Sequence, residues 1–137
     1  MFSMATNIEE LYIFDGFSKE EITYFLLMSQ TQYRKVGERI LSLGDISNGC
    51  AYYIHSGKVR IIQWGEEVAI LATGSFFGEI ALITDEPRTA TVEVIEDAEL
   101  QVFLKDDFLT LIKQSTHGRE MQEEIMRRIR ERVRTKD

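Results

Sequence analysis

Residues 76–91 contain the side chains of this sequence that are best suited to binding chemistry. The stretch reads FFGEIALITDEPRTAT and carries one carboxylate early, Glu79, and one guanidinium late, Arg88. Gly78 has no Cβ, so the backbone there can come close to a ligand. If the next residues form one helical turn, their free N–H groups make an anion site. Arg88 would complete that site with paired, charge-assisted hydrogen bonds to phosphate oxygens.

The predicted anion site also contains the carboxylate of Glu79, which carries a negative charge of its own. A carboxylate next to a phosphate is repelled unless it accepts hydrogen bonds from a neutral donor. A sugar hydroxyl on the same ligand meets that requirement. The stretch therefore predicts a site for a phosphorylated ribose.

Other kinds of chemistry find less support in the sequence. His55 and His117 are too few and too far apart in sequence to suggest a jelly-roll metal site. The acidic pairs at 106–107 and 123–124 are interpreted as solvated helix faces, and no nucleophile–base pattern is present. We therefore predict a protein that is not an enzyme and holds no metal.

Size and charge limit the class of protein. The 137 residues suit one domain, 1–137, and a hydrophobic content of 44% suits a globular fold. No run of apolar residues is long enough to cross a bilayer, so we expect no membrane insertion. The lone Cys50 and the lack of a signal-peptide pattern favour a cytoplasmic setting.

The net charge of −7 is spread unevenly along the chain. Residues 1–117 hold 9 Lys/Arg against 18 Asp/Glu, and residues 118–137 hold 7 against 5. The first part is thus −9 and the last part +2. An acidic body disfavours nucleic acid as a partner, because neutralising phosphates requires a basic surface.

The predicted elements that must position the site divide the chain into three parts. In residues 1–31 we expect short helices, with Ser18 and Glu21 forming a capping box at the start of one of them. In residues 32–104, strand-length segments between glycine turns predict an eight-stranded antiparallel, jelly-roll-like β-roll. Residues 105–137 are expected to form two C-terminal helices. The expected fold class is α+β.

FGEIAL followed by PRTATV resembles the phosphate-binding cassette of cyclic nucleotide-binding domains. These occur in protein kinase A regulatory subunits, cyclic-nucleotide-gated channels and bacterial catabolite activators. The resemblance extends over most of the chain, through GD, six residues, then YYIHSGKVRI, and through KDDFLTLI. The family implies that Glu79 accepts from the ribose 2′-hydroxyl and that Arg88 pairs with the exocyclic phosphate oxygens. Other implied pocket residues are Phe77, Gly78, Ile80, Ala81, Thr89 and Ala90.

The resemblance implies cAMP or cGMP as the ligand. A threonine at position 89 can reach a syn guanine, which favours cGMP, but family members with this threonine also respond to cAMP. We expect cAMP, because the compact chain resembles prokaryotic examples. A possible base wall consists of Val59, Ile61 and Ile70, for which packing in the core is the alternative.

In this family the C-terminal helices move over the filled pocket. Met126, Ile129 and Arg130 are candidates for a lid over the base. The helix would then signal to an effector protein or pair with a second copy. The sequence carries no helix-turn-helix, membrane span or kinase motif, so we expect a free-standing regulatory module or a fragment of a larger protein. A degenerate, ligand-free adaptor domain is the alternative.

Overall fold

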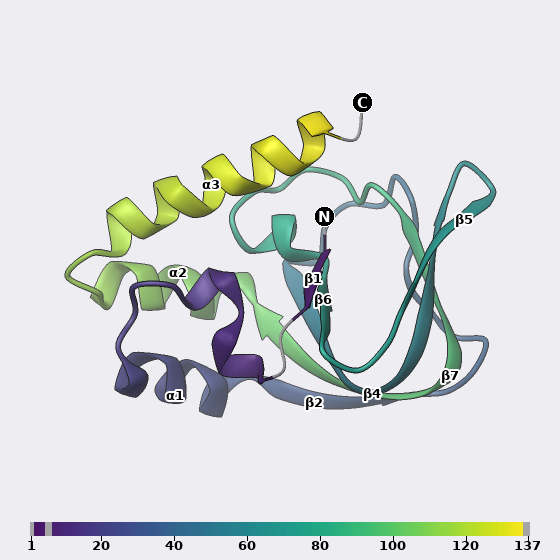
Figure 1. Ribbon diagram of the computed structural model, residues 1–137, viewed down its shortest axis with the longest axis horizontal. Helices are drawn as coiled ribbons and strands as arrows, with labels where there is room; N and C mark the ends of the chain where they lie inside the picture. The colour runs from purple at the N-terminus through teal and green to yellow at the C-terminus, as the bar shows by residue number, and fades with distance from the viewer. Residues whose placement is uncertain (1, 5–6, 136–137) are drawn as a thin grey trace.

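The computed structural model describes residues 2–4 and 7–135, with the side chains of residues 7–128, 130 and 131. Helices stand at one end of an antiparallel sheet, which confirms the α+β class (Figure 1). The strands are β1 (Phe2–Met4), β2 (Gln30–Arg34), β3 (Arg39–Leu41), β4 (Cys50–Gln63), β5 (Glu66–Leu71), β6 (Ser75–Phe77) and β7 (Thr91–Leu104). The α-helices are α1 (Lys19–Met28), α2 (Lys105–Gln114) and α3 (Gly118–Thr135), and the 3-10 helices are η1 (Ile8–Glu10), η2 (Tyr12–Phe14) and η3 (Glu79–Leu82).

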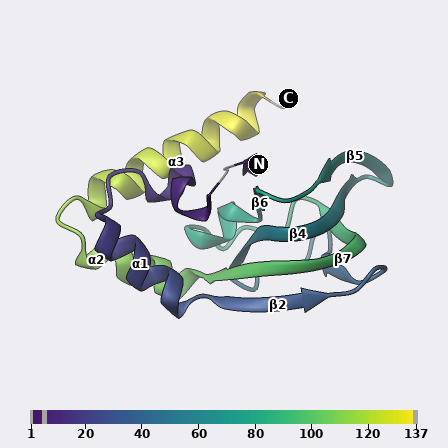
Figure 2. The same ribbon diagram turned by 60° about the horizontal axis from the view of Figure 1, so that its bottom comes forward.

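The sheet is built around its two long strands, β4 and β7. The strand order is β1-β6-β4-β7-β2, with β5 paired to β4 and β3 paired to β7, all antiparallel. Figure 2 shows β4, β7 and β2 running side by side along the length of the sheet. This roll holds β3, β6 and the start of β7 close to one another, and the site described below lies among them.

The strand count differs from the expected eight, because the described residues form seven strands. Strand ends at Ser56–Gly57 and at Asp97 would give shorter and more numerous strands, but β4 and β7 run through these positions with shifts of register. Gly57 has a φ of +92°, and a Cβ there would lie 2.4 Å from the carbonyl oxygen of Asp97. A glycine therefore bends the paired strands instead of ending them.

The N-terminal helices follow their local sequence signals. Ser18 accepts a hydrogen bond from the Glu21 N–H, at 3.1 Å, and the Glu21 carboxylate accepts one from the Ser18 N–H, at 2.9 Å. This is the expected capping box. The segment before it forms the two short 3-10 helices η1 and η2.

Aromatic side chains join these helices to the sheet. The ring of Phe25 lies 5.3 Å from Phe103 of β7 and 5.9 Å from Phe108 of α2, centroid to centroid. Phe76 of β6 completes the contact with Phe103 at 5.6 Å. A second buried cluster fills the roll itself and includes Tyr52, Ile54 and Leu100. Strand β6, which leads into the site, is thus packed on both of its faces.

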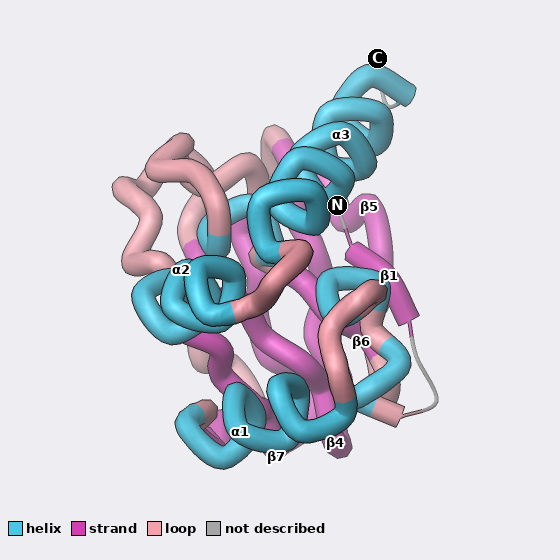
Figure 3. The backbone as a smooth tube through the Cα atoms, turned by 90° about the vertical axis from the view of Figure 1, so that its left-hand side faces the viewer, coloured by secondary structure: helices cyan, strands magenta, loops and turns pink. Residues whose placement is uncertain are grey.

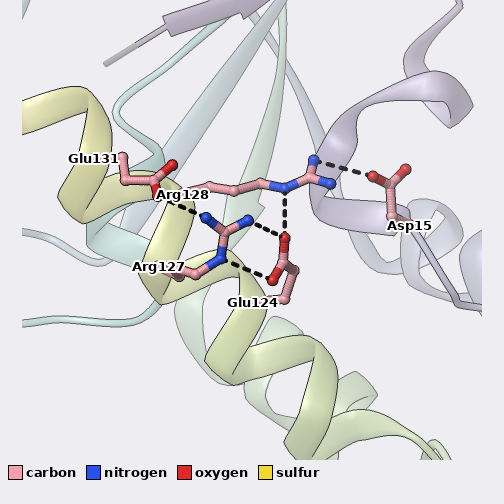
Figure 4. A network of polar contacts seen from close by, with 5 residues as sticks. All are labelled: Asp15, Glu124, Arg127, Arg128 and Glu131. Carbon is pink, nitrogen blue, oxygen red and sulfur yellow. Dashed lines mark hydrogen bonds and ion pairs between the residues drawn. The ribbon is translucent and has the colours of Figure 1, made fainter. Parts of the chain in front are cut away.

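Helix α3 rests on the N-terminal segment through residues up to Arg128. Ile125 is buried in the helical core. Nη1 of Arg128 lies 3.1 Å from Oδ2 of Asp15, and the guanidinium carbon of Arg128 lies 5.6 Å from the ring centre of Tyr12. Figure 4 shows this bridge together with the ion pairs that Glu124 makes along the helix. Figure 3 shows α1, α2 and α3 gathered in front of the strands.

Candidate functional site

A pocket lies where β6 turns into η3, facing the loop that precedes β7. It encloses about 560 Å³, part of which is open to solvent. The lining residues come from β3, β4, β6, η3, β7 and the loop before β7: Leu41, Ile61, Phe77, Gly78, Glu79, Ile80, Ala81, Glu86, Pro87, Arg88, Thr89, Ala90 and Val92. The pocket thus gathers segments that are far apart in the sequence.

The turn from β6 into η3 depends on Gly78. Its φ of +76° and ψ of +16° are left-handed, a conformation that costs residues with a Cβ about 1 kcal/mol or more. A Cβ at this position would also lie 3.1 Å from Nη1 of Arg88. Glu79 follows as the first residue of η3, and only 1% of its surface is exposed. The expected single helical turn after the glycine is present.

Arg88 enters the pocket from the opposite side and is held by neutral oxygens. Its Nη2 donates to the side-chain oxygen of Asn48 and to the carbonyl of Cys50, the latter at 2.8 Å, and its Nη1 donates to the carbonyl of Gly78 at 3.4 Å. Its backbone is fixed as well, since its N–H donates to the carbonyl of Asp45 at 2.9 Å. Side-chain and backbone hydrogen bonds thus both fix the position of the guanidinium.

The electrostatics of the pocket follow from this arrangement. Arg88 is 8% exposed, and among the described residues no carboxylate lies within ion-pair distance of its guanidinium. Burial lowers the pKa of Arg88, partly offset by Tyr52 and Cys50 nearby. Burial also raises the pKa of the Tyr52 hydroxyl, which accepts a hydrogen bond from Asn48 at 3.4 Å. A buried cation with only neutral partners favours an anionic ligand.

The structure brings the eight predicted cassette residues together. Phe77, Gly78, Glu79, Ile80, Ala81, Arg88, Thr89 and Ala90 all line the same pocket. The ring of Phe77 also stacks on Tyr52, with 5.2 Å between ring centres. Phe77 therefore belongs both to the pocket wall and to the core of the roll. The ligand contacts of these eight residues remain predictions.

The three candidate base-wall residues take different positions. Ile61 lines the pocket. Val59 is fully buried in the roll core, and Ile70 on β5 is 54% exposed. Neither Val59 nor Ile70 is among the residues that line the pocket in this conformation.

The lid candidates lie on α3. Met126 is half-buried and Arg130 is exposed, whereas the side chain of Ile129 lies outside the described residues. No described side chain of α3 lines the pocket. Their assignment to a lid would thus require α3 to take another position, and it remains a prediction.

Five residues of the site were not among the predicted site residues. Leu41, Glu86, Pro87 and Val92 line the pocket, and Asn48 holds Arg88. Asn48 and Arg88 are separated by 40 positions, so no local pattern links them. Glu86 and Pro87 lie directly before Arg88 within the quoted stretch, so their position could have indicated them.

The described part of the chain holds no group of three or more His, Cys, Asp or Glu side chains arranged to bind a metal ion. None of the helices in the described ranges is both long and apolar enough to span a membrane.

Comparison with known proteins assigns the chain to a family. Residues 31–115 match the model of the cyclic nucleotide-binding domain, and the chain belongs to that family. It is 33% identical to the Cyclic AMP receptor protein of Thermus thermophilus, over 74% of this chain and 49% of that protein. It is 34% identical to a cGMP-dependent protein kinase of Plasmodium berghei, over 62% of this chain and 10% of the kinase. The chain thus spans about half of the first relative and a tenth of the second.

Solved structures agree with this assignment. A regulatory subunit of a cAMP-independent protein kinase A from Trypanosoma cruzi, bound to guanosine, superposes with a TM-score of 0.71 at 26% identity. The match covers 75% of this chain and 37% of that one.

Proposed function

We propose that this chain is a regulatory sensor module that binds a cyclic purine nucleotide, cAMP in preference to cGMP. In this proposal Arg88 pairs with the exocyclic phosphate oxygens and Glu79 accepts from the ribose 2′-hydroxyl. The module performs no catalysis itself. Its output is a change in the position of its C-terminal helices.

The observation that carries this proposal is the charge arrangement of the pocket. Arg88 is 8% exposed and donates to oxygens that bear no net charge, while Glu79, 1% exposed, lines the same pocket. A phosphate can offer the Arg88 guanidinium a negative charge, and a ribose hydroxyl can donate to the Glu79 carboxylate. A ligand that carries both groups on one ring can contact both side chains.

Thr89 is the pocket residue that bears on the choice between cAMP and cGMP, so the experiment compares both nucleotides. Thr89 lines the pocket, and its carbonyl accepts a hydrogen bond from Gln63 at 3.1 Å. This contact ties the loop to the end of β4 and leaves the Thr89 hydroxyl available for a purine. The relatives of the chain include both a Cyclic AMP receptor protein and a cGMP-dependent protein kinase.

Signalling requires a difference in affinity between two conformations. A ligand can shift α3 only by binding one position of the helix more tightly than the other. No described side chain of α3 lines the pocket in this conformation, so closure over a bound base would be a distinct state. The partner that reads this change is an effector protein or a second copy, and the lone Cys50 supports a reducing, cytoplasmic setting.

Isothermal titration of the purified protein tests the proposal. Protein shown to be free of co-purified nucleotide is titrated with cAMP, cGMP, adenosine and guanosine side by side. We expect cAMP to bind most tightly and each nucleoside to bind more weakly than its cyclic nucleotide. Absence of binding by either cyclic nucleotide would favour the alternative function, a ligand-free adaptor domain. Equal affinity for nucleoside and nucleotide would remove Arg88 from phosphate recognition.

A further inference from the structure

A second hollow lies between helices α1 and α2, which contact each other in the fold (Figures 1 and 3). It encloses about 900 Å³, including space open to solvent. None of its lining residues lines the nucleotide pocket. We call this hollow the α1–α2 groove. Its lining residues are Glu20, Glu21, Tyr24, Phe25 and Met28 of α1 and Asp107, Thr110, Leu111 and Gln114 of α2.

The two helices form the walls of the groove along most of their length. The lining residues recur at steps of three and four positions, from Glu20 to Met28 on α1 and from Asp107 to Gln114 on α2. Such steps keep side chains on one face of a helix. Each wall is therefore a stripe of about two turns, or about 11 Å. Two stripes of this length, one on each helix, form a seat into which the ridge of a third helix can pack.

The groove combines a buried apolar floor with an exposed apolar edge. Phe25 of α1 and Leu111 of α2 are both buried. Tyr24 and Met28 line the same groove but are 61% and 42% exposed. Leu27, three positions after Tyr24, is 79% exposed. An apolar face of this kind on a surface helix is typical of contact with a further packing partner.

The charged side chains that line the groove are all acidic. Glu20 and Glu21 belong to the first turn of α1, and Asp107 belongs to the first turn of α2. Glu21 caps its own helix. Within the described part of the chain, neither Glu20 nor Asp107 forms an ion pair. The complementary partner therefore carries basic side chains beside its apolar ones.

The described arginines at the centre of α3 are engaged within their own molecule. Arg127 pairs with Glu124 and Glu131. Arg128 pairs with Glu124 and Asp15. We therefore assign the occupant of the groove to another protein. We propose that the α1–α2 groove binds an amphipathic helix of a partner protein, with apolar side chains on one face and Lys or Arg on either side of that face.

A synthetic peptide tests this chemistry. The probe is a fluorescein-labelled peptide of about 14 residues, or four helical turns, with leucines along one face and lysines beside them. Anisotropy measures its binding to the full chain. One control peptide carries Glu in place of every Lys, and another has the same residues in an order without an apolar face. We expect saturable binding of the probe that weakens as salt rises, and at least tenfold weaker binding of both controls.

Variants of the protein locate the binding site. Tyr24→Lys places a cation in the groove and should weaken binding of the basic peptide at least tenfold. Ile46→Lys is the matched control, because it makes the same change of charge in the loop between β3 and β4, where Ile46 is 89% exposed and lies outside the groove. Equal effects of the two variants would place the peptide elsewhere and contradict the proposal.

A second pair of variants tests the carboxylates. Glu20→Gln together with Asp107→Asn should weaken binding of the basic peptide by about three- to tenfold and reduce its salt dependence. Glu66→Gln together with Glu67→Gln removes the same charge from exposed positions of β5, outside the groove, and should leave binding almost unchanged. Equal losses for the two double variants would mean that the peptide responds only to the net charge of the protein.

Other outcomes would also overturn the proposal. One is the absence of peptide binding, and another is equal binding of the three peptides. A third is self-association, measured by sedimentation, that Tyr24→Lys abolishes and Ile46→Lys does not, because the occupant of the groove would then be a second copy of this chain. Cyclic nucleotide binding is measured separately, and its result does not enter these outcomes.

Discussion

Arg88 places a positive charge in a pocket where no carboxylate of the described residues lies within ion-pair distance. The three hydrogen bonds of its guanidinium go to an amide oxygen and two backbone carbonyls. These acceptors orient the guanidinium without neutralising it. A phosphate can therefore bind the guanidinium in this position without displacing a carboxylate.

We predict that Arg88→Lys weakens cyclic nucleotide binding at least tenfold, roughly 1.4 kcal/mol. A lysine keeps the charge but loses the paired geometry of the guanidinium. Titration calorimetry measures the change, with Arg119→Lys as a control, since Arg119 is 93% exposed on α3. An unchanged affinity of the Arg88 variant would mean that this residue does not bind the phosphate.

Glu79 offers a test that uses the ligand as well as the protein. Glu79→Gln should weaken binding of cyclic ribonucleotides more than binding of their 2′-deoxy forms. The reason is that only the ribonucleotide donates a 2′-hydroxyl hydrogen bond to the carboxylate, and such bonds to charged groups contribute about 1.5–3 kcal/mol. Competition binding gives the comparison, with the unchanged protein and Glu79→Gln each measured against the ribonucleotide and its 2′-deoxy form. Equal losses for both ligands would exclude Glu79 from ribose recognition.

Asn48 is expected to act on the ligand only through Arg88. Asn48→Ala removes one acceptor of the guanidinium and leaves the two backbone acceptors in place, so it should weaken cyclic nucleotide binding by about three- to tenfold, in the range of one ordinary net hydrogen bond. A double-mutant cycle separates this role from a general loss of structure. In an Arg88→Ala background, Asn48→Ala should cause little further loss, because coupled residues do not add. Additive losses would contradict the positioning role.

At the scale of elements, α3 is attached to the turn between η2 and α1. Arg128 bridges to Asp15 at 3.1 Å and lies over the ring of Tyr12 (Figure 4). Along the helix, hydrogen bonds from Arg127 and Arg128 lower the pKa of Glu124 to about 2. The Arg128 bridge joins two segments that are separated by 113 positions in sequence. It therefore opposes any movement of α3 away from the N-terminal segment.

We predict that Arg128→Ala raises hydrogen exchange of the α3 backbone amides by a factor of about 2 to 10. The bridge is partly exposed, so its loss is limited to that of a surface ion pair plus a cation–π contact. Mass spectrometry of exchange in α3 peptides measures the effect. Arg119→Ala serves as the control, because its pairing with Glu123 stays within the helix. Equal exchange in the two variants would mean that the Arg128 bridge does not hold α3.

At the scale of the whole molecule, the pocket draws on both halves of the core. Ile80 of η3 lines the pocket and packs against the helical cluster. Phe77 and Ala90 belong to the cluster inside the roll. A ligand that contacts this pocket binds only the folded chain and so stabilises the fold as a unit.

Cyclic nucleotide should therefore raise the thermal midpoint of the protein. At a hundred times the dissociation constant the expected stabilisation is about 2.7 kcal/mol, which corresponds to several degrees for a domain of this size. Differential scanning calorimetry at increasing cAMP and cGMP concentrations gives the two curves. Arg88→Ala should remove most of the shift at the same concentrations. A shift that persists in full in this variant would indicate binding elsewhere on the molecule.

Local signals in the sequence predicted a large part of this arrangement. The capping box of Ser18 and Glu21, the turn at Gly78 and the short η3 helix each depend on residues within a few positions of one another. The same holds for the cassette that contains Glu79 and Arg88, whose residues all line one pocket. Such features follow from backbone geometry and short-range hydrogen bonding, so a reader of the sequence can recognise them.

The contacts between segments that are distant in sequence were decided by the tertiary structure. Whether β4 and β7 break or bend was set by the contact of Gly57 with Asp97 across the strands. That Asn48 holds Arg88, that Ile61 reaches the pocket, and that Val59 and Ile70 do not line it all depend on how the roll closes. The residue types that can bind a phosphorylated ribose were thus determined by the sequence alone. Their neighbours were determined by the fold, because contacts between distant segments exist only after strands and helices have packed.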